Sequence, residues 1–545
     1  MKKIYYILAT AVTTVLFAAC TKDLNTLPLN PTDTTSETAY TSEESSYLNG
    51  LARIYLQFVN CDLTDLQLTD GGTSELIRAY WSLNEVSTDA AKCAWNGDAW
   101  VAAINTNTWS DADNDAAYAV YVRTMQGVSF VNEFLRQTTD SKLGDRGCSD
   151  AVKASVAAMR AEARFIRAYL YWMAMDVFGS VPFTTEDSPF GAVNPVPATR
   201  QEVFQFIVEE LTDLASDGSA MPAARSNYPR ADKGSALGLL ARVYLNAEVY
   251  SGTAMWNEAK ATCERIFALG YDTASNYADI FRGDNGQNPD VLKEMLWAVD
   301  YNAEQTQSWG GTTLLTFACI SETDAATYHS NGVNNGWGGM RTPYDYVQKY
   351  FGVTGQDYGT GDYTIEDKRG QFFYIVGRTE NISDLSKFDQ GWACYKYNNV
   401  PHDMTAEDFA ATAATKGYSD IDYPMIRLGE IILIYAEACM HTNSVASALP
   451  YLKKLTDRAG VAAPTSITQD FLVAERAREL MWEGHRRTDL IRYGLFTSDS
   501  FLWPWKGGTM LGQGFESYKT IFAIPRSELS SNPELKQNPG YGTQK

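Results

Sequence analysis

Apolar side chains recur every three or four residues over long stretches of the chain, which is the spacing of one face of an α-helix. The clearest stretch runs over Met159, Ala163, Ile166, Leu170, Met173 and Val177. Phe178-Gly179 follows directly and Pro182 comes soon after, and glycine and then proline commonly end a helix in this order. The pattern therefore predicts a long helix that ends near Gly179.

A second helix is predicted to begin at a capping box. Thr199 offers an oxygen to the first free backbone amides, and Glu202, three residues later, can accept from the start of the helix. Apolar positions then continue from Phe204 to Leu214 at helical spacing. The same spacing predicts further helices over residues 237–247, 256–270, 428–439, 449–460 and 472–481.

These predicted helices follow one another in pairs that short turns connect, although no strict sequence period accompanies them. Each helix pair of a helical-repeat protein buries its apolar face against the next pair. We therefore predict an all-α fold in which about four tetratricopeptide-like helix pairs form a superhelical scaffold.

Two regions lack this periodicity. Residues 61–110 are rich in Trp, Asn, Asp and Gly, and residues 283–425 contain Gly-Gly runs and many Asn and Tyr residues. A structureless loop of that length is unusual in a compact domain. We expect both regions to form irregular layers over the helices, and such loop-rich faces often carry function.

The N-terminus has the pattern of a bacterial lipoprotein signal. Lys2 and Lys3 precede a mostly apolar run from Ile4 to Phe17, which matches the core of a signal peptide. The run is shorter than the roughly 20 apolar residues that a membrane-spanning helix needs. It ends in Ala18-Ala19-Cys20, which resembles the lipobox that precedes a lipid-modified cysteine.

This pattern divides the chain into three parts. We predict a signal peptide over residues 1–19, a tether over residues 20–40 with lipid on Cys20, and a single domain over residues 41–545. The acyl chains, rather than a spanning helix, would hold the protein to the membrane.

Charge narrows the range of partners. The formal net charge is −21 and the pI is about 4.7. Nucleic acid is disfavoured as a partner, because binding to its phosphates depends on Lys and Arg. Aromatic residues make up 12% of the chain, and we expect a few of them to lie exposed as binding platforms.

The cysteines after Cys20 lie far apart and form no Cys-x-x-Cys motif. A zinc site or a disulfide framework would show closer, patterned spacing. We therefore expect mainly isolated buried thiols, with at most one or two bridges that the sequence does not identify, at Cys61, Cys93, Cys148, Cys263, Cys319, Cys394 and Cys439.

Several short motifs occur in a recognisable order along nearly the whole chain. They are Arg160–Tyr169, Phe178-Gly179 with Val181-Pro182, Lys233–Ala236 with Leu240–Tyr244, Pro424–Glu430 with Tyr435–Ala438, Glu475-Arg476 with Glu479-Leu480, Glu483–Arg487 with Asp489-Leu490, Arg492–Gly494, Ile524-Pro525 and Asn538–Tyr541. In this order, and with the lipobox, they resemble the SusD/RagB family of nutrient-binding lipoproteins of the Bacteroidetes.

The resemblance implies a helical scaffold under a loop-rich ligand-binding face, with an N-terminal SusD-like part over about residues 41–225 and a C-terminal part over about residues 290–545. It implies a lipid-anchored outer-membrane protein that captures a polysaccharide or oligosaccharide and delivers it to a SusC-like TonB-dependent barrel. Some relatives take peptides, so peptide capture stays open as an alternative, as does a repeat scaffold without a small ligand.

Sequence signatures of catalysis are missing. The four histidines are His329, His402, His441 and His485, and none precedes a Glu as in a two-His zinc helix. There is no Gly-x-Ser-x-Gly elbow and no Gly-Lys of a P-loop. A carboxylate pair for glycoside hydrolysis stays open, because sequence does not reveal a separation. We interpret the chain as a binding protein without a metal or cofactor.

Clusters of charged residues have a structural interpretation. We expect Glu483, His485 and Asp489, with the arginines beside them, to form ion pairs at a helix end. The same holds for Arg160, Glu162, Arg164 and Arg167, which we expect to pair between helices. The run from Asp111 to Asp115 lacks the Gly and Glu of a calcium loop, and we expect it to cap the following helix.

A sugar ring has an apolar C–H face and a rim of hydroxyl groups, so a glycan site combines flat aromatic rings with polar side chains. Trp95 and Asn96 lie in the turn-forming sequence Trp-Asn-Gly-Asp. Trp337 and Trp309 are each followed by two glycines, which leaves the indole faces open. We predict that these four residues bind the glycan and that Arg341 is a further polar contact.

Three other tryptophans are weaker candidates for the same role. They are Trp81, Trp100 and Trp109. Trp109 occupies a position that the family resemblance marks as structural.

Overall fold

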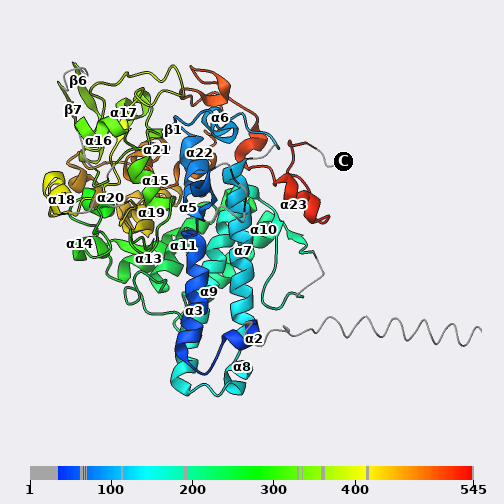
Figure 1. Cartoon of the computed structure of the whole chain (residues 1–545). Coiled ribbons are helices and arrows are strands. Elements are labelled where there is room, and N and C mark those ends of the chain that lie inside the picture. Colours follow the sequence, from blue (N-terminus) through cyan, green and yellow to red (C-terminus); the bar gives the residue numbers. More distant parts are fainter. Residues whose placement is uncertain are drawn as a thin grey trace, which may run out of the picture.

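The computed structural model describes residues 35–542 apart from residues 62–65, 67, 69, 112, 113, 190–193, 328–330, 334, 358–361 and 413–416. The predicted signal peptide and Cys20 lie outside these residues. Helices dominate the described chain, and the irregular segments gather beside them (Figure 1). No described helix has both the length and the apolar character to cross a bilayer.

Long helices in the first half of the chain form one side of the molecule. They are α3 (Glu44–Tyr55), α7 (Asp115–Gln137), α9 (Asp150–Phe178) and α10 (Arg200–Leu214). Helix α9 packs against the other three, and α3, α7 and α9 run alongside one another in Figure 1. The helix predicted to end near Gly179 is confirmed, because Gly179 adopts φ 74° directly after α9.

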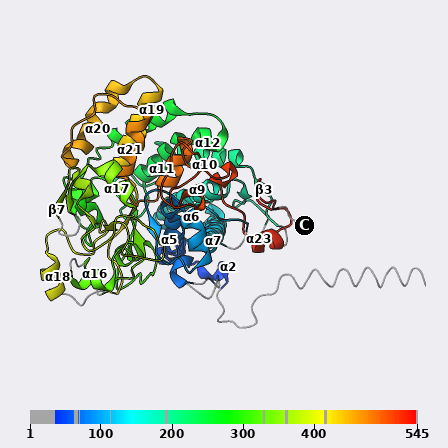
Figure 2. The ribbon, with the colours of Figure 1, turned by 90° about the horizontal axis from the view of Figure 1, so that it is seen from above.

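The stack continues through helices that come later in the sequence. They are α11 (Lys233–Leu245), α13 (Trp256–Ala268), α19 (Leu428–His441), α20 (Val445–Ala459) and α21 (Gln469–Glu479). Helix α10 packs on α11, α11 on α13, α13 on α19, and α19 on α20. Helices α19, α20 and α21 lie at the opposite end of the molecule from α2 in Figure 2. The predicted helical fold is confirmed.

Shorter elements connect these helices. The short helices are α2 (Ser36–Ala39), η2 (Leu56–Phe58), η3 (Gly71–Ser74), α5 (Leu76–Trp81), η4 (Ser82–Val86), α6 (Ala99–Thr106), α8 (Asp140–Asp145), α12 (Ala247–Ser251), η5 (Ala278–Phe281), α14 (Pro289–Leu292), α15 (Gly311–Phe317), α16 (Glu322–Thr327), α17 (Tyr344–Phe351), η6 (Lys368–Gly370), α18 (Ala406–Thr412), α22 (Arg486–Arg492), η7 (Lys506–Gly508), η8 (Ser517–Thr520) and α23 (Arg526–Ser531). Several of them fall inside the two regions predicted to be irregular.

Strands of two to five residues pair antiparallel, two by two, in the described chain. The pairs are β1 (Lys92–Cys93) with β5 (Met340–Arg341), β2 (Val181–Pro182) with β3 (Pro197–Ala198), β4 (Met295–Val299) with β10 (Tyr423–Arg427), β6 (Val353–Asp357) with β7 (Asp362–Ile365), and β8 (Phe373–Tyr374) with β9 (Ala393–Cys394). The β1–β5 pair matters most for the site, because it joins the two predicted irregular regions.

Ion pairs join α9 to its neighbours, as predicted from the charges at 160–167. Arg164 and Arg167 both bind Glu210 of α10, with nitrogen–oxygen distances of 2.7 and 3.0 Å. Glu162 pairs with Arg230 at 2.5 Å. Arg160 differs from the prediction, because its guanidinium donates to the carbonyl of Leu135 at 2.6 Å at the C-terminal end of α7.

A buried charge network joins the C-terminal helices to the irregular layer. Glu479 accepts from Arg369, Arg427 and Arg458 at 2.9, 2.7 and 2.5 Å. Arg427 also binds Glu483 at 2.6 Å, which confirms the structural interpretation of that residue. All five side chains are at most 5% exposed. Removing one member would leave buried charges without partners, and such losses are costly.

Hydrogen bonds join the N-terminal fifth of the chain to residues 482–485, which come after α21. The indole N–H of Trp81 donates to the carbonyl of Trp482 at 2.9 Å, and that of Trp482 donates to Ala90 at 3.1 Å. Glu85 accepts from the backbone amides of Gly484 and His485 at 2.8 and 3.0 Å. Residues about 400 positions apart thus complete each other's hydrogen bonds.

The prediction for the thiols holds except at Cys61, which is not buried. The seven described cysteines are free, six of them are buried and Cys61 is partly exposed. The predicted capping role of the 111–115 run is also confirmed, because the side chain of Asn114 accepts from the amide of Ala117 at the start of α7.

Candidate functional site

Three tryptophans from distant parts of the sequence gather at one surface. The ring centroids of Trp309 and Trp337 are 6.0 Å apart, and those of Trp95 and Trp337 are 6.5 Å apart. Neighbouring rings are tilted by 49° and 42°. We call Trp95, Trp309 and Trp337 the tryptophan arc. The structure therefore brings together the three indoles that the sequence singled out.

Short elements explain how these side chains meet. Strand β1 precedes Trp95 and pairs with β5, and the amide of Ala94 donates to the carbonyl of Gly339 at 2.8 Å. Helix α15 begins just after Trp309, and Phe317 at its end packs on Trp337 with centroids 5.0 Å apart. One sheet pair and one two-turn helix thus fix the positions of all three rings.

Two glycines let the backbone come close to the arc. A Cβ on Gly339 would lie 2.5 Å from the ring of Trp95, so any larger residue would displace that indole. Gly311 adopts φ 46°, and a Cβ there would lie 1.9 Å from the hydroxyl of Tyr301. The Gly-Gly pairs seen in the sequence therefore serve close packing beside the rings.

The three rings differ in exposure. Trp309 is 44% exposed, which is the largest exposed fraction of any tryptophan in the described chain. Trp95 and Trp337 are partly buried and pack against the core. Tyr418 lies beside Trp309, with centroids 4.6 Å apart. The arc thus presents an exposed ring at Trp309, while its other two rings, Trp95 and Trp337, pack against the hydrophobic core.

Arg78 contacts two residues of the arc, a role that was not predicted from the sequence. Its guanidinium lies 5.5 Å from the ring centroid of Trp95 and donates to the carbonyl of Trp309 at 3.1 Å. It also forms an ion pair with Asp70. Arg78 is 3% exposed, so it positions two of the three rings at once.

Glu75 holds the segment that leads to Trp309. Its carboxylate accepts from the hydroxyl of Tyr301 and from the amides of Arg78 and Gly311 at 2.5 and 3.0 Å. Burial raises the pKa of Glu75 to about 7, although these hydrogen bonds lower it. The side chain is fully buried, so it is a support for the site and cannot touch a ligand.

Polar groups border the arc next to Trp95. Asn96 is partly buried and its oxygen accepts from Asn105 at 3.2 Å. Asp98 is also partly buried, and burial together with Asp70 raises its pKa. Asn96 lies where the sequence predicted a polar companion, whereas Asp98 is an additional carboxylate at the same turn.

Arg341 does not lie at this surface, contrary to the prediction. It is 0% exposed, and its guanidinium donates to the carbonyls of Leu385 and Gln390 at 2.7 and 3.3 Å. Its place in β5 turns the side chain into the protein. The expectation that it contacts a ligand is therefore wrong.

The weaker tryptophan candidates are also buried. Trp81, Trp100 and Trp109 are 1%, 7% and 3% exposed. The indole N–H of Trp109 donates to the hydroxyl of Tyr541 at 2.8 Å, which confirms its structural role. These rings have no face free for a ligand.

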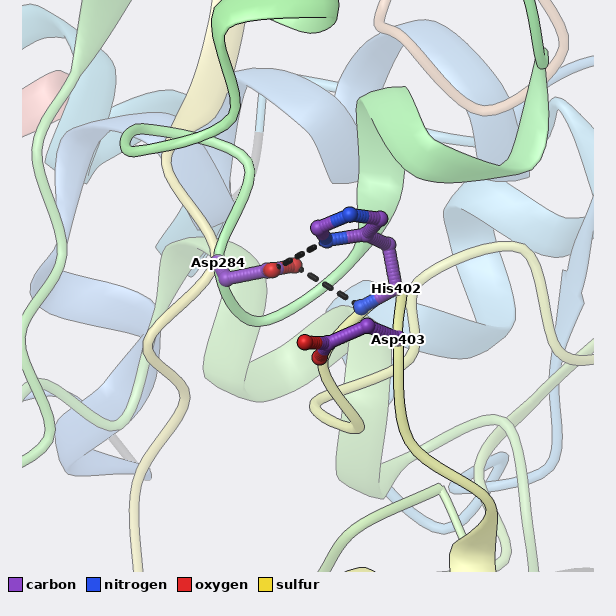
Figure 3. A group of neighbouring side chains, drawn as sticks. All are labelled: Asp284, His402 and Asp403. Atoms are coloured by element: carbon purple, nitrogen blue, oxygen red, sulfur yellow. Dashed lines mark hydrogen bonds and ion pairs between the residues drawn. The ribbon is translucent and has the colours of Figure 1, made fainter.

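Among the described residues, Asp284, His402 and Asp403 are the three potential metal ligands that lie close together, within 4.8 Å of one another. Figure 3 shows Asp284 directed at the imidazole and the backbone amide of His402. Nδ1 of His402 lies 2.5 Å from Asp284, and this hydrogen bond raises the pKa of His402. When the ring is protonated it forms an ion pair with Asp284, and a proton on Nδ1 competes with a metal for that nitrogen.

Comparisons with known protein families match both halves of the chain. Residues 74–245 match a family described as starch-binding and associating with the outer membrane. Residues 355–541 match the SusD family.

Characterised relatives agree with these matches. The chain is 28% identical to the starch-binding protein SusD of Bacteroides thetaiotaomicron, and the alignment covers 99% of both chains. It is 27% identical to a SusD-like protein of Bacteroides ovatus, over 65% of this chain and 62% of that protein.

Solved structures share the fold. A SusD-like carbohydrate-binding protein of Bacteroides fragilis superposes with a TM-score of 0.68 at 20% identity, covering 91% of this chain and 99% of that one. Surface glycan-binding protein A of Bacteroides thetaiotaomicron, solved in complex with laminarihexaose, gives a TM-score of 0.68 at 17% identity, with coverage of 91% and 99%.

Proposed function

Because the chain belongs to the SusD/RagB family, we propose that it is a glycan-binding protein of the outer membrane that captures a polysaccharide or oligosaccharide. The tryptophan arc is the observation that supports this function. Each indole offers a flat apolar face that matches the C–H face of a sugar ring, and one such contact contributes roughly 1 kcal/mol. Three neighbouring rings let one chain make several contacts at once.

The tilt between the rings favours a curved glycan. A flat, extended polymer would touch all three faces only if they were coplanar, whereas neighbouring rings here are inclined by 42° and 49°. An α-glucan chain curves along its length. The relative that aligns over 99% of both chains is a starch-binding protein, so α-glucan is the ligand class we propose first.

Binding rather than hydrolysis fits the groups around the arc. A glycosidase needs a carboxylic acid with a raised pKa that reaches the scissile bond. Glu75 has a raised pKa and lies near the arc, but it is fully buried and three groups donate to its oxygens. Asp98 is the other carboxylic acid at the arc with a raised pKa, and it is partly exposed. Capture without cleavage is proposed because the chain carries no sequence signature of catalysis and matches a family described as starch-binding.

The proposed setting is the cell surface. The lipobox before Cys20 supports attachment by acyl chains, and one family description names association with the outer membrane. Family membership supports a SusC-like TonB-dependent barrel as the partner that receives the glycan.

Affinity electrophoresis tests the function directly. The chain without residues 1–20 is run in native gels that contain amylopectin, and we expect retardation. Trp309→Ala and Trp337→Ala should each reduce it, because each removes one ring of the arc. Trp256→Ala is the matched control, since Trp256 stacks on His441 far along the sequence from the arc and should not change mobility.

The outcomes separate the alternatives. Equal retardation of all variants would contradict the assignment of the arc. Retardation by laminarin but not by amylopectin would keep the glycan function and reject the α-glucan. Binding of a peptide mixture with no glycan binding would favour the peptide-capturing alternative.

A further inference from the structure

We propose that the glycan-binding surface continues past Trp309 into a second subsite, a pocket lined by amides between α3, α7 and residues 306–307, which binds the hydroxyl groups of the next sugars of a neutral oligosaccharide. This inference rests on the proposed function. The pocket has a volume of about 290 Å³. The polar side chains that line it include those of Arg53, Gln57, Asn60, Gln126 and Gln307.

The pocket directly adjoins the arc. Gln307 lines it and precedes Trp309 by two residues, a separation of at most about 7 Å along an extended chain. On the other wall, the thiol of Cys61 donates to the carbonyl of Gly71 at 3.1 Å. The next residue, Gly72, lies against Trp309, since a Cβ on it would be 2.8 Å from the carbonyl oxygen of Trp309. The pocket therefore lies within reach of a bound chain that continues past Trp309.

The lining suits hydroxyl groups. Gln57, Asn60, Gln126 and Gln307 each carry an amide, which both donates and accepts hydrogen bonds. None of the residues that line the pocket is acidic, although Asp and Glu outnumber Lys and Arg by 66 to 45 in the whole chain. A neutral saccharide matches such a surface.

Gln57 carries an acceptor that lacks a partner. The side chain is 3% exposed, and among the described residues no group donates to its Oε1. Its Nε2 is occupied, since it donates to the carbonyl of Arg53 at 3.4 Å. An unsatisfied buried acceptor costs about 1–3 kcal/mol. Because Gln57 lines the pocket, a rotation of its side chain that turns Oε1 toward the pocket would let a sugar hydroxyl satisfy this acceptor.

Arg53, one helical turn before Gln57, provides donors to the same pocket. Its guanidinium lies 4.4 Å from the ring centroid of Phe130. Within the described chain no ion pair involving Arg53 is present, so its N–H groups remain available to ligand oxygens. Phe130 orients the guanidinium and adds an apolar surface beside it.

A neighbouring groove marks where the polar surface ends. It shares Leu56, Val59 and Thr306 with the pocket, and its other residues include Leu48 and Leu51. The apolar character of this groove offers few partners for hydroxyl groups. The proposed subsite is therefore short and extends the arc by only a few sugars.

The test compares a short and a long α-glucan, because only the long one can contact the tryptophan arc and the pocket at the same time. Calorimetry measures maltotriose and maltoheptaose binding to the chain without residues 1–20. Arg53→Ala and Gln57→Met should each weaken maltoheptaose binding about five-fold, the effect of one hydrogen bond, and leave maltotriose binding unchanged. Arg282→Ala is the matched control, since no ion pair of Arg282 is present in the described chain either and it lines a different pocket.

Cys61 gives a second readout without a mutation. The other six described cysteines are buried, so alkylation of the folded protein reports on Cys61. Maltoheptaose should slow this alkylation and maltotriose should not.

The results distinguish the two proposals. An unchanged maltoheptaose affinity in both pocket variants, with binding lost in Trp309→Ala, would overturn the subsite and leave the glycan function standing. Failure of the unmodified protein to bind either glucan or amylopectin would overturn the α-glucan function and the subsite with it.

Discussion

At the scale of single residues, Trp337 occupies the centre of the arc. It contacts Trp309 on one side and Trp95 on the other, and Phe317 packs on it from α15. Trp309 is more exposed, but Trp337 links the other two rings. Loss of Trp309 removes one contact with the ligand, whereas loss of Trp337 also removes the packing that orients its neighbours.

Arg78→Lys tests whether Arg78 positions the rings of Trp95 and Trp309. Lysine can keep the ion pair with Asp70 but cannot also donate to the carbonyl of Trp309 and lie flat beside Trp95. We expect glycan affinity to fall several-fold. The near-ultraviolet circular dichroism, which reports the mutual orientation of the indoles, should change as well. Arg225→Lys, at a guanidinium near Tyr271, is the control and should change neither; an unaltered affinity in Arg78→Lys would count against a positioning role.

Glu85 gives a prediction about pH. Burial raises the pKa of Glu85 to about 8, despite the amides of Arg486, Gly484 and His485 that lower it. Between about pH 4.5 and pH 8, the carboxyl group of Glu85 is protonated in the folded protein. In the unfolded chain, where its pKa has the ordinary value of 4.5, the same group is ionised. Stability from this group is therefore lost as pH rises from about 4.5 to 8, by about 1.4 kcal/mol per pH unit.

Glu85→Gln isolates this contribution. Glutamine keeps an oxygen for the amides of Gly484 and His485 and does not titrate. Urea denaturation at pH 5.5 and 7.5 should show a smaller loss of unfolding free energy in the variant than in the unmodified protein. Parallel pH dependences of the two proteins would refute the raised pKa.

The tryptophans of the site were predictable because their immediate neighbours are glycine and asparagine, which leave a side chain open. The same logic failed for Arg341, which comes two residues after Gly339 and lies in β5. Its side chain direction depends on pairing with β1, about 250 positions earlier in the sequence, and local sequence does not encode that pairing. Arg78 and Glu75 escaped prediction for the same reason, because their partners at Trp309 and Gly311 are distant in sequence.

At the scale of elements, helices were predictable because their apolar period and caps are local. The capping box at Thr199 is present: its side chain accepts from the amide of Glu202 at 3.2 Å, and Glu202 accepts back from the amide of Thr199 at 2.8 Å. The irregular layer was harder. Helices α5, α6 and α15 are too short for a clear period, and paired strands of two residues carry no alternating pattern.

The buried charges that hold these elements together give a further prediction. Burial disfavours the charged form of Glu479, yet Arg458, Arg427 and Arg369 hold its pKa at about 2. Glu479→Ala leaves three buried guanidinium groups short of a partner, so we expect a loss of about 3–5 kcal/mol in unfolding free energy.

Asp457→Ala provides the comparison. Asp457 pairs with Lys453 on the surface of α20, where both side chains are more than half exposed. Such a pair contributes about 0–1 kcal/mol. Urea denaturation at neutral pH should therefore separate the two variants clearly, and similar losses in both would contradict the importance of the network.

At the scale of the whole molecule, the attachment to the membrane can be separated from ligand binding. Cys20 and the arc belong to different parts of the chain, and the described fold begins at residue 35. Cys20→Ala should move the protein from the membrane fraction to the soluble fraction after cell lysis, with unchanged affinity for amylopectin. Labelling with radioactive palmitate should disappear in the same variant; retained label would place the lipid elsewhere.

The contacts between Trp81, Glu85 and Ala90 near the beginning and Trp482 to His485 near the end also determine when folding can finish. Contacts that close large loops form slowly. A chain that has emerged only as far as α21 still lacks the groups that complete the hydrogen bonds of α5 and η4. Folding of this part of the protein therefore cannot finish until the chain is available as far as His485.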